Sequence, residues 1–221
     1  MSTDTPVVVR AYRTPFGKEG GVFADVRPED LSIPLIDRIL EETDLTGEDV
    51  DDLKWGCAQQ RSEQGNNMAR VIALMSQLGE ATPATTINRW CASSAEAIIN
   101  AADAIRAGQR ECIIAGGVES MSRVPMGEND EFHPGLDEYH DLADLRMGMT
   151  AETVAERYGV TRRTQDEYAA QSQQRAVAAT EEGRFDDEIV PIEGHDEDGE
   201  AITVTEDEGL RPGTTVEKLA E

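Results

Sequence analysis

The sequence is short of cysteine, histidine and long apolar runs, and these shortages exclude several classes of protein. Its 221 residues include three histidines and three cysteines, and the cysteines, at positions 57, 91 and 112, follow no regular spacing. Such a set provides neither a disulfide framework nor a four-ligand zinc site, and it is typical of a reducing cytoplasm. Near the amino terminus the only apolar run is Val7 to Val9, which is too short for the core of a signal peptide. No run is long enough to cross a membrane, so we expect a cytoplasmic protein without a membrane partner.

Lysine is equally scarce. The chain has three lysines, and its 45 acidic residues against 20 Lys and Arg give a formal net charge of -25. Such a surface repels nucleic acid and anionic lipid, so neither is an expected partner. Concentrated salt screens this self-repulsion, because the Debye length falls to about 3 Å at molar ionic strength, and we therefore expect a halophilic protein. The other interpretation of the acidity, disorder, is confined to the tail, since the 38% of hydrophobic residues gather in well-defined segments.

The first part of the chain alternates short apolar runs with segments of helical periodicity. The pattern predicts strands over residues 5–10, 53–57, 84–88 and 112–117, and helices over 31–40, 67–77 and 94–107. Pro34 is expected in the first turn of its helix, where a missing N–H is tolerated. The third helix is expected to bury Ala95, Ile98, Ala102 and Ile105. Strands that alternate with helices favour an α/β layered fold.

The composition changes after Ser122. Gly, Pro, Asn, Asp and Glu dominate residues 123–140, so we place a boundary there, between domains 1–122 and 123–221. The second domain is expected to contain helices over 150–158 and from Thr161, its N-cap, followed by a hairpin of 188–192 and 201–205. His133, His140 and His195 fall in predicted surface loops without a surrounding pattern of metal ligands. No metal site is predicted.

Cys91 lies in the predicted turn between the strand over 84–88 and the helix over 94–107. A helix N-terminus presents unpaired N–H groups, which favour a thiolate and can stabilise an oxyanion on an attached acyl group. Taken alone, a cysteine in such a unit is more often a core residue, so the neighbouring sequence has to decide. Cys57 and Cys112 belong to predicted strands and are interpreted as core residues. Glu96 is interpreted as favouring the helix N-terminus, with a role as a base as the alternative.

Six segments carry a more specific signal. They are Arg13–Gly17, Gln64–Arg70, Asn88–Ser93, Ala115–Ser122, Met147–Glu152 and Arg211–Leu219. In content and in order they resemble segments of the thiolase family, and the resemblance extends along nearly the whole chain. Ser94 stands where the family has glycine, but serine also serves well at a helix start, so we do not expect this departure to inactivate the protein.

The resemblance implies a thiolase-like layered α-β-α fold with an inserted loop domain. It also implies a transferase of lipid and fatty acid metabolism, an acetyl-CoA acetyltransferase or a 3-ketoacyl-CoA thiolase. In such an acyltransferase Cys91 would take an acyl group as a thioester and pass it to coenzyme A or to the enolate of acetyl-CoA. By the same resemblance Met147 lines the acyl and pantetheine pocket, acyl-CoA is the partner, and the protein is a homodimer or homotetramer. Coenzyme A enters as a substrate, and no cofactor is expected.

Motifs of the family's second half have no counterpart in this sequence. These are a Gly-His-Pro histidine, a Cys-x-Gly cysteine and an Asn-Glu-Ala-Phe segment. We therefore expect an amino-terminal fragment with an incomplete core, inactive alone or completed by a second subunit. Two alternatives stay open: a non-catalytic or split subunit that binds acyl-CoA, and a related condensing enzyme such as a ketoacyl or hydroxymethylglutaryl-CoA synthase.

Overall fold

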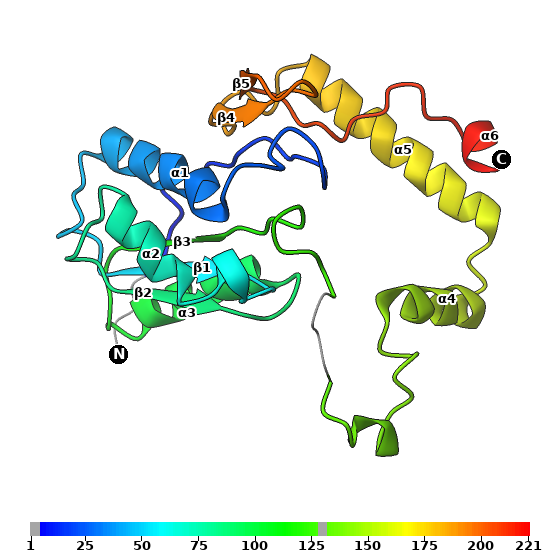
Figure 1. Cartoon of the computed structure of the whole chain (residues 1–221), viewed down its shortest axis with the longest axis horizontal. Coiled ribbons are helices and arrows are strands. Elements are labelled where there is room, and N and C mark those ends of the chain that lie inside the picture. The colour runs from blue at the N-terminus through cyan, green and yellow to red at the C-terminus, as the bar shows by residue number, and fades with distance from the viewer. Residues whose placement is uncertain (1–4, 128–131) are drawn as a thin grey trace. The chain divides into compact units, whose positions relative to one another are not determined.

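The computed structural model describes residues 5–127 and 132–221 (Figure 1). The chain divides into two compact units, the first made of Met1–Met126 with Asp186–Gly209, the second of Gly127–Phe185 with Leu210–Glu221. This division differs from the expected domains 1–122 and 123–221, because residues 186–209 return to the first unit. Residues 128–131 of the expected polar stretch lie outside the described residues.

The first unit is built on a parallel sheet of three strands. These are β1 (Asp52–Gly56), β2 (Ala84–Ile87) and β3 (Ile113–Gly117), in the order β2-β1-β3. In the register of the sheet, Leu53 lies opposite Ala84 on one side and Ile114 on the other. Helices α1 (Pro28–Thr43) and α2 (Met68–Met75) cover one face, and α3 (Ser93–Arg106) covers the other (Figure 1). The prediction of a layered α/β fold is confirmed.

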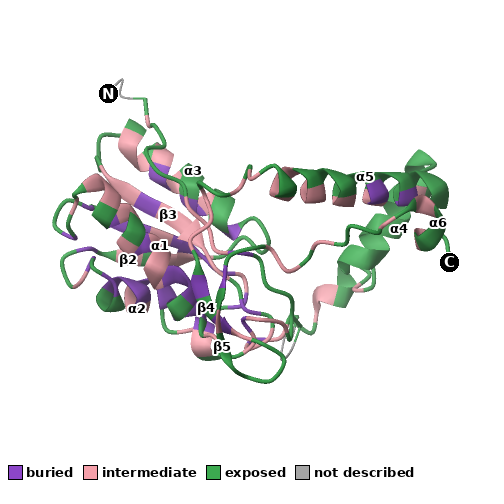
Figure 2. Ribbon diagram, turned by 90° about the horizontal axis from the view of Figure 1, so that it is seen from above, coloured by how far each residue is buried: buried purple, intermediate pink, exposed green. Residues whose placement is uncertain are grey.

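The main core lies between the sheet and the pair of helices α1 and α2. Its fully buried side chains include Ile36, Leu40, Leu53, Met68 and Ile72. Figure 2 colours the buried parts of the chain purple. Burial of each such side chain contributes roughly 1.5–3 kcal/mol. This core fixes the sheet and therefore fixes the loops that leave its carboxyl ends.

Helix α1 is longer than its apolar periodicity indicated. It begins at Pro28, so Pro34 lies inside the helix. The expectation that Pro34 lies in the first turn was therefore wrong. The early start is favoured by Pro28 itself, because proline is preorganised for the first helical position. Pro34 lacks the N–H that would bond within the helix, and the burial of Ile36 and Leu40 offsets this loss.

The strand expected over residues 5–10 is absent from the structure. This segment pairs with no strand among the described residues, and Val7, Val8 and Val9 are 76%, 79% and 66% exposed. A β-branched run forms a strand only where a partner supplies hydrogen bonds, and β propensity alone does not supply them. As a result β3 is an edge strand of the described sheet.

The hairpin of β4 (Ile192–His195) and β5 (Ala201–Val204) confirms the predicted turn, with a first strand that starts later than expected. Ile192 and Val204 form a second buried cluster with Phe23 and Leu31. This packing explains why residues 186–209 belong to the first unit and not to a separate loop domain.

The second unit is helical. It contains α4 (Met147–Tyr158), α5 (Arg162–Glu181) and the short α6 (Val216–Leu219), with a 3-10 turn at Leu136–Glu138. The predicted N-cap of α5 is confirmed, since the Thr161 side chain accepts a hydrogen bond from the Thr164 N–H. Within the described ranges, no helix has the length and apolar character needed to span a membrane.

Candidate active site

Cys91 is exposed in the turn that joins β2 to α3. Three side-chain hydrogen bonds shape this turn: Trp90 N–H donates to Asn88 Oδ1 (2.8 Å), Arg89 N–H donates to Ser93 Oγ (2.8 Å), and Ser93 Oγ donates to the Trp90 carbonyl (2.5 Å). Trp90 has a φ of 50°, in the left-handed region that residues other than glycine rarely adopt. The turn therefore places Cys91 two residues before the first residue of α3, as the sequence predicted.

Helix α3 begins two residues after Cys91. Unpaired N–H groups of the first helical turn carry a partial positive charge, which stabilises an anion beside them. Glu96 in this turn is held by an ion pair with Arg89 (3.0 Å), and its side chain is 16% exposed. Because Arg89 already neutralises this carboxylate, the structure favours the electrostatic interpretation of Glu96 over a role as a base.

Two glycines allow α3 to approach the carboxyl ends of the strands. A Cβ atom at Gly56, the last residue of β1, would lie 2.4 Å from the Ser94 nitrogen. A Cβ atom at Gly117, the last residue of β3, would lie 2.2 Å from Ser94 Oγ. Sequence analysis did not single out these glycines, and their position at the ends of two apolar strands was the available signal. Both strands end where α3 begins, at the edge of a parallel sheet where ligands usually bind.

The other two thiols are less exposed than Cys91, and Cys57 is a core residue, as the sequence indicated, whereas Cys112 also lines the open cleft beside β3. Cys57 is buried in the main core, and this burial, with the nearby Glu119 carboxylate, raises the pKa of its thiol to about 12. Cys112 is half-buried against the same core, and burial followed by the charge of Asp51 raises the pKa of its thiol. Both thiols stay protonated near neutral pH and are poor nucleophiles.

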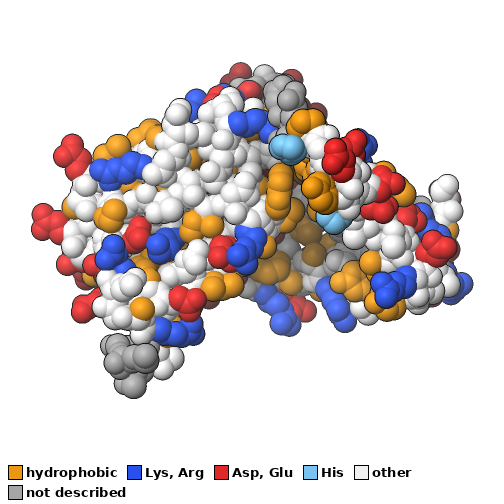
Figure 3. Space-filling model, turned by 90° about the horizontal axis from the view of Figure 1, so that it is seen from below, with side chains coloured by type: hydrophobic (Ala, Val, Ile, Leu, Met, Phe, Trp, Pro, Cys, Tyr) orange, Lys and Arg blue, Asp and Glu red, His pale blue; other side chains and the backbone are white. Residues whose placement is uncertain are grey.

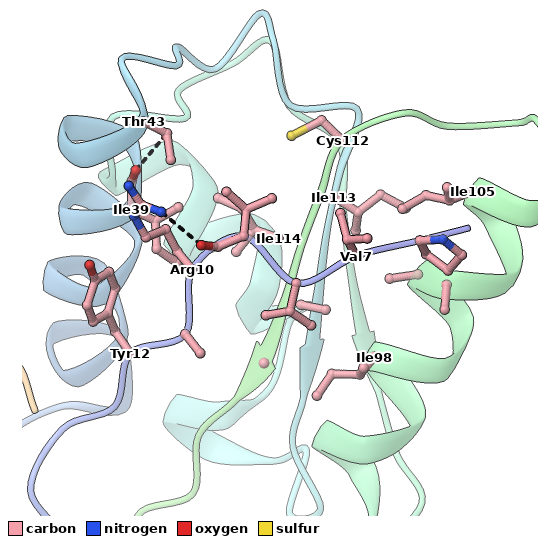
Figure 4. Close-up of a pocket in the computed structure, with 18 of the residues that line it drawn as sticks. Val7, Arg10, Tyr12, Ile39, Thr43, Ile98, Ile105, Cys112, Ile113 and Ile114 are labelled. Atoms are coloured by element: carbon pink, nitrogen blue, oxygen red, sulfur yellow. Dashed lines mark hydrogen bonds between the residues drawn. The ribbon is translucent and has the colours of Figure 1, made fainter. Parts of the chain in front are cut away.

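An open cleft of about 1450 Å³ lies along the outer edge of β3. Figure 4 shows the segment that carries Val7 and Arg10 crossing this cleft between α1 and α3. Ile98 and Ile105 of α3 line it, and Ile98 is 51% exposed.

The expectation that Ala95, Ile98, Ala102 and Ile105 form the buried stripe of α3 was therefore wrong. The buried residues of α3 are Ser93, Ala97 and Ala101, because the small residues are the ones that fit against the sheet.

Met147 belongs to the second unit and is the first residue of α4. Its side chain is 68% exposed and lines a shallow groove of about 610 Å³ between α4 and the start of α5. Val154 and Val160 share the groove, so its walls are largely apolar.

The histidines do not converge. His133 and His140 are exposed in the second unit, as expected, whereas His195 is the last residue of β4 and is half-buried. The expectation of a surface-loop His195 was wrong, because Phe23 and Val22 pack beside this strand and its N–H donates to the Val22 carbonyl (2.9 Å). In the part of the chain that the structure describes, no three His, Cys, Asp or Glu side chains gather as metal ligands would.

Comparison with known proteins gives consistent matches. A family model described as "Thiolase, N-terminal domain" matches residues 6–221. A 3-ketoacyl-CoA thiolase of Pseudoalteromonas translucida is 47% identical over 219 residues, which cover 98% of this chain and 56% of that protein. One of Marinobacter nauticus is 45% identical over 217 residues, with 97% and 56% covered. The crystal structure of the Bacillus anthracis acetyl-CoA acetyltransferase superposes with a TM-score of 0.82 at 33% identity, over 97% of this chain and 57% of that one. The chain thus spans little more than half the length of these relatives.

Proposed function

Because the chain belongs to the thiolase family, we propose that it acts in acyl transfer with Cys91 as the nucleophile. The observation that carries this proposal is the geometry of Cys91: an exposed thiol in the turn between β2 and α3, at the carboxyl end of the sheet. The pKa values of the Cys57 and Cys112 thiols are both raised, which makes them weaker nucleophiles near neutral pH than an unperturbed thiol.

In the proposed first step the Cys91 thiolate attacks the carbonyl carbon of an acyl-CoA thioester. The tetrahedral oxyanion forms beside the N-terminus of α3, where helix N–H groups favour negative charge. The attack forms the C–S bond to Cys91, and collapse of the intermediate restores the carbonyl, breaks the C–S bond to coenzyme A and expels the coenzyme A thiolate. In the second step the enolate of acetyl-CoA attacks the acyl group and frees Cys91, which gives condensation. Thiolysis is the reverse: Cys91 attacks the 3-keto carbonyl of a 3-ketoacyl-CoA, the carbon–carbon bond breaks with release of the acetyl-CoA enolate, and coenzyme A then takes the acyl group.

Each step also needs a group that accepts or returns a proton. Glu96 is paired with Arg89, and His195, the histidine of the first unit, belongs to the hairpin strand β4. We therefore assign the proton acceptor to a further segment or to a second subunit. The relatives are longer than this chain and would supply such a segment. The expected consequence is slow turnover by the 221-residue chain alone.

Substrate and setting are part of the same proposal. The relatives are named 3-ketoacyl-CoA thiolase and acetyl-CoA acetyltransferase, which supports acyl-CoA as the substrate and a place in lipid metabolism. The apolar groove at Met147 supports a contact there with the acyl or pantetheine part of that substrate. We propose a homo-oligomer in a reducing, salt-rich cytoplasm, and three free cysteines support the reducing setting. Coenzyme A and its acyl thioesters are the substrates that the proposed chemistry requires.

The test is intact-protein mass spectrometry after incubation with acetyl-CoA in molar KCl. We expect an acetyl adduct on the parent chain and on the matched control Cys112→Ser, and none on Cys91→Ser. An adduct that survives in Cys91→Ser would disprove the assigned nucleophile. If a folded parent chain takes up acetyl only when the carboxyl-terminal half of a relative is added, that result would favour a split subunit instead.

The matched family model and the names of the relatives favour a thiolase over the related condensing enzymes that the sequence left open. A product analysis would separate them, because a hydroxymethylglutaryl-CoA synthase releases a branched hydroxy-acid product and a thiolase does not.

A further inference from the structure

The carboxylate of Glu119, two residues after β3, organises the loop that follows β1. It accepts hydrogen bonds from the backbone N–H groups of Ala58 (2.7 Å) and Gln59 (3.2 Å) and from Gln64 Nε2 (2.5 Å). Gln64 is fully buried, and its Oε1 accepts in turn from the Ser120 N–H (2.7 Å). The loop after β1 and the segment after β3 are therefore held together by a set of mutually satisfied polar groups.

A second link connects this loop to the turn that carries Cys91. The Ala58 carbonyl accepts a hydrogen bond from Asn88 Nδ2 (2.9 Å), and Asn88 Oδ1 accepts from the Trp90 N–H (2.8 Å). Asn88 is on the surface, yet both ends of its amide are engaged. The chain of bonds runs from Glu119 through Ala58 and Asn88 to Trp90, the residue before Cys91.

The link of hydrogen bonds ends at Trp90, whose backbone conformation is strained. A φ of 50° is unfavourable for a residue other than glycine, so the turn needs contacts that hold it in place. The Trp90 carbonyl accepts from both the Ser93 hydroxyl and the Ser93 N–H (3.0 Å), whereas the Trp90 N–H donates to Asn88 Oδ1. Loss of the Asn88 contact removes the acceptor for the Trp90 N–H and loosens the Arg89–Trp90 peptide, on which the conformation of the turn before Cys91 depends.

We infer that Asn88 is a positioning residue for Cys91, with Glu119 as the anchor behind it. This inference rests on the proposed function, since it concerns the orientation of the proposed nucleophile. Asn88 does not itself contact the reacting atoms. It acts by holding the left-handed turn, and misplacement of a reacting group by about 1 Å is enough to slow a reaction by about 100-fold.

The experiment compares Asn88→Ala, Asn88→Asp and the control Asn100→Ala, whose side chain lies on α3 away from the turn. Acetyl transfer from acetyl-CoA to Cys91 is followed by mass spectrometry over a range of acetyl-CoA concentrations in molar KCl. For Asn88→Ala we expect the limiting rate to fall about tenfold or more, with the half-saturating concentration unchanged. Asn88→Asp keeps the acceptor for the Trp90 N–H and should recover part of the rate, which a general loss of stability would not explain.

A second measurement does not depend on acyl transfer. The rate of Cys91 alkylation by iodoacetamide, located by peptide mapping, should fall about threefold in Asn88→Ala and stay at the parent value in Asn100→Ala. If the parent chain takes no acetyl group, the proposed function fails while alkylation still decides the role of Asn88. The inference would be overturned if a folded Asn88→Ala were acetylated at the parent rate. Where the parent takes no acetyl group, alkylation of a folded Asn88→Ala at the parent rate would overturn it.

Discussion

At the scale of single residues, Gly56 limits how closely α3 can approach the sheet. In Gly56→Ala the added Cβ would meet backbone atoms of Ser93 and Ser94 at 2.5 and 2.4 Å, and backbone cannot move aside as a flexible side chain can. We expect a loss of about 3 kcal/mol in the free energy of unfolding. Urea denaturation in molar KCl measures it.

Gly209→Ala is the control for this prediction, because a Cβ there would meet no atom within 4 Å and its φ is not in the positive range. It should leave stability unchanged within about 0.5 kcal/mol. Equal urea midpoints for the two variants would show that the start of α3 is not tightly packed on β1.

The Cys57 thiol gives a residue-scale prediction about pH. Burial and Glu119 raise its pKa to about 12, whereas an unfolded chain has its thiol pKa near 9.0. A group whose pKa is raised in the folded state contributes full stability below the unfolded value and loses it as pH rises through the folded value. Stability should therefore fall between about pH 9 and about pH 12 by at most about 1.4 kcal/mol per pH unit from this one group.

Unfolding curves of the parent and of Cys57→Ala at several alkaline pH values test this. The parent should lose stability more steeply than the variant, since only the parent has the buried thiol. Parallel pH dependences would mean that Cys57 is not protected from ionisation by the fold.

At the scale of elements, the attachment of the β4-β5 hairpin depends on Arg13. Its guanidinium bonds Glu188 (2.5 Å) and Asp207 (2.7 and 3.1 Å), so residues on both sides of the hairpin meet one cation. Burial opposes ionisation of Asp207, but the bonds from Arg13 and from the Phe16 N–H outweigh it and lower the pKa of that carboxyl. This contribution is present above the ordinary value of 3.8 and is lost as pH falls through the lowered pKa.

Asp207→Asn removes the charge and keeps the shape. We expect it to destabilise attachment of the hairpin by about 1–2 kcal/mol, because the pair is mostly buried, with side-chain exposures of 22% and 16%. Amide hydrogen exchange should accelerate over residues 186–209 and not over α2. As the control, Glu167→Gln breaks the exposed pair with Arg163 and should change exchange little. Unchanged protection of the hairpin in Asp207→Asn would contradict the assigned anchor.

The elements also show what the sequence could predict. Periodicity located β1, β2, β3, α2 and α3 within two residues or so at each end, because their apolar spacing matches how they pack. It failed for residues 5–10, whose valines lack a strand partner, and for the buried side of α3, where the small Ala97 and Ala101 are buried and the larger Ile98 is exposed. The turn that carries Cys91 was predictable from its strand-turn-helix setting, and the role proposed for Cys91 came from the neighbouring motifs. Asn88, Gly56 and Glu119 all contact residues distant in sequence, which periodicity does not reveal.

At the scale of the whole molecule, acidity is the dominant feature. Asp and Glu number 45 against 20 Lys and Arg, so acidic side chains outnumber basic ones by 25. Figure 3 shows acidic side chains spread over one face and not gathered at a single place. Spread-out like charges repel over a distance set by the Debye length, about 10 Å at 0.1 M salt and about 3 Å at 1 M. Salt should therefore stabilise the fold as a whole and not one site.

The test of this halophilic proposal is the unfolding temperature at about 0.1 M and about 2 M KCl. We expect the parent to gain on the order of 10 °C in high salt, because screening removes self-repulsion of the compact state. A variant with Glu193, Glu197, Glu200 and Glu206 all changed to Gln should gain less, since these exposed carboxylates contribute to the repulsion. The same four positions changed to Asp keep the charge and should retain the parent's gain. A gain that is equal in the Gln and Asp variants would show that salt acts through hydrophobic burial and not through screening, and an unfolding temperature that falls with salt would rule out the adaptation itself.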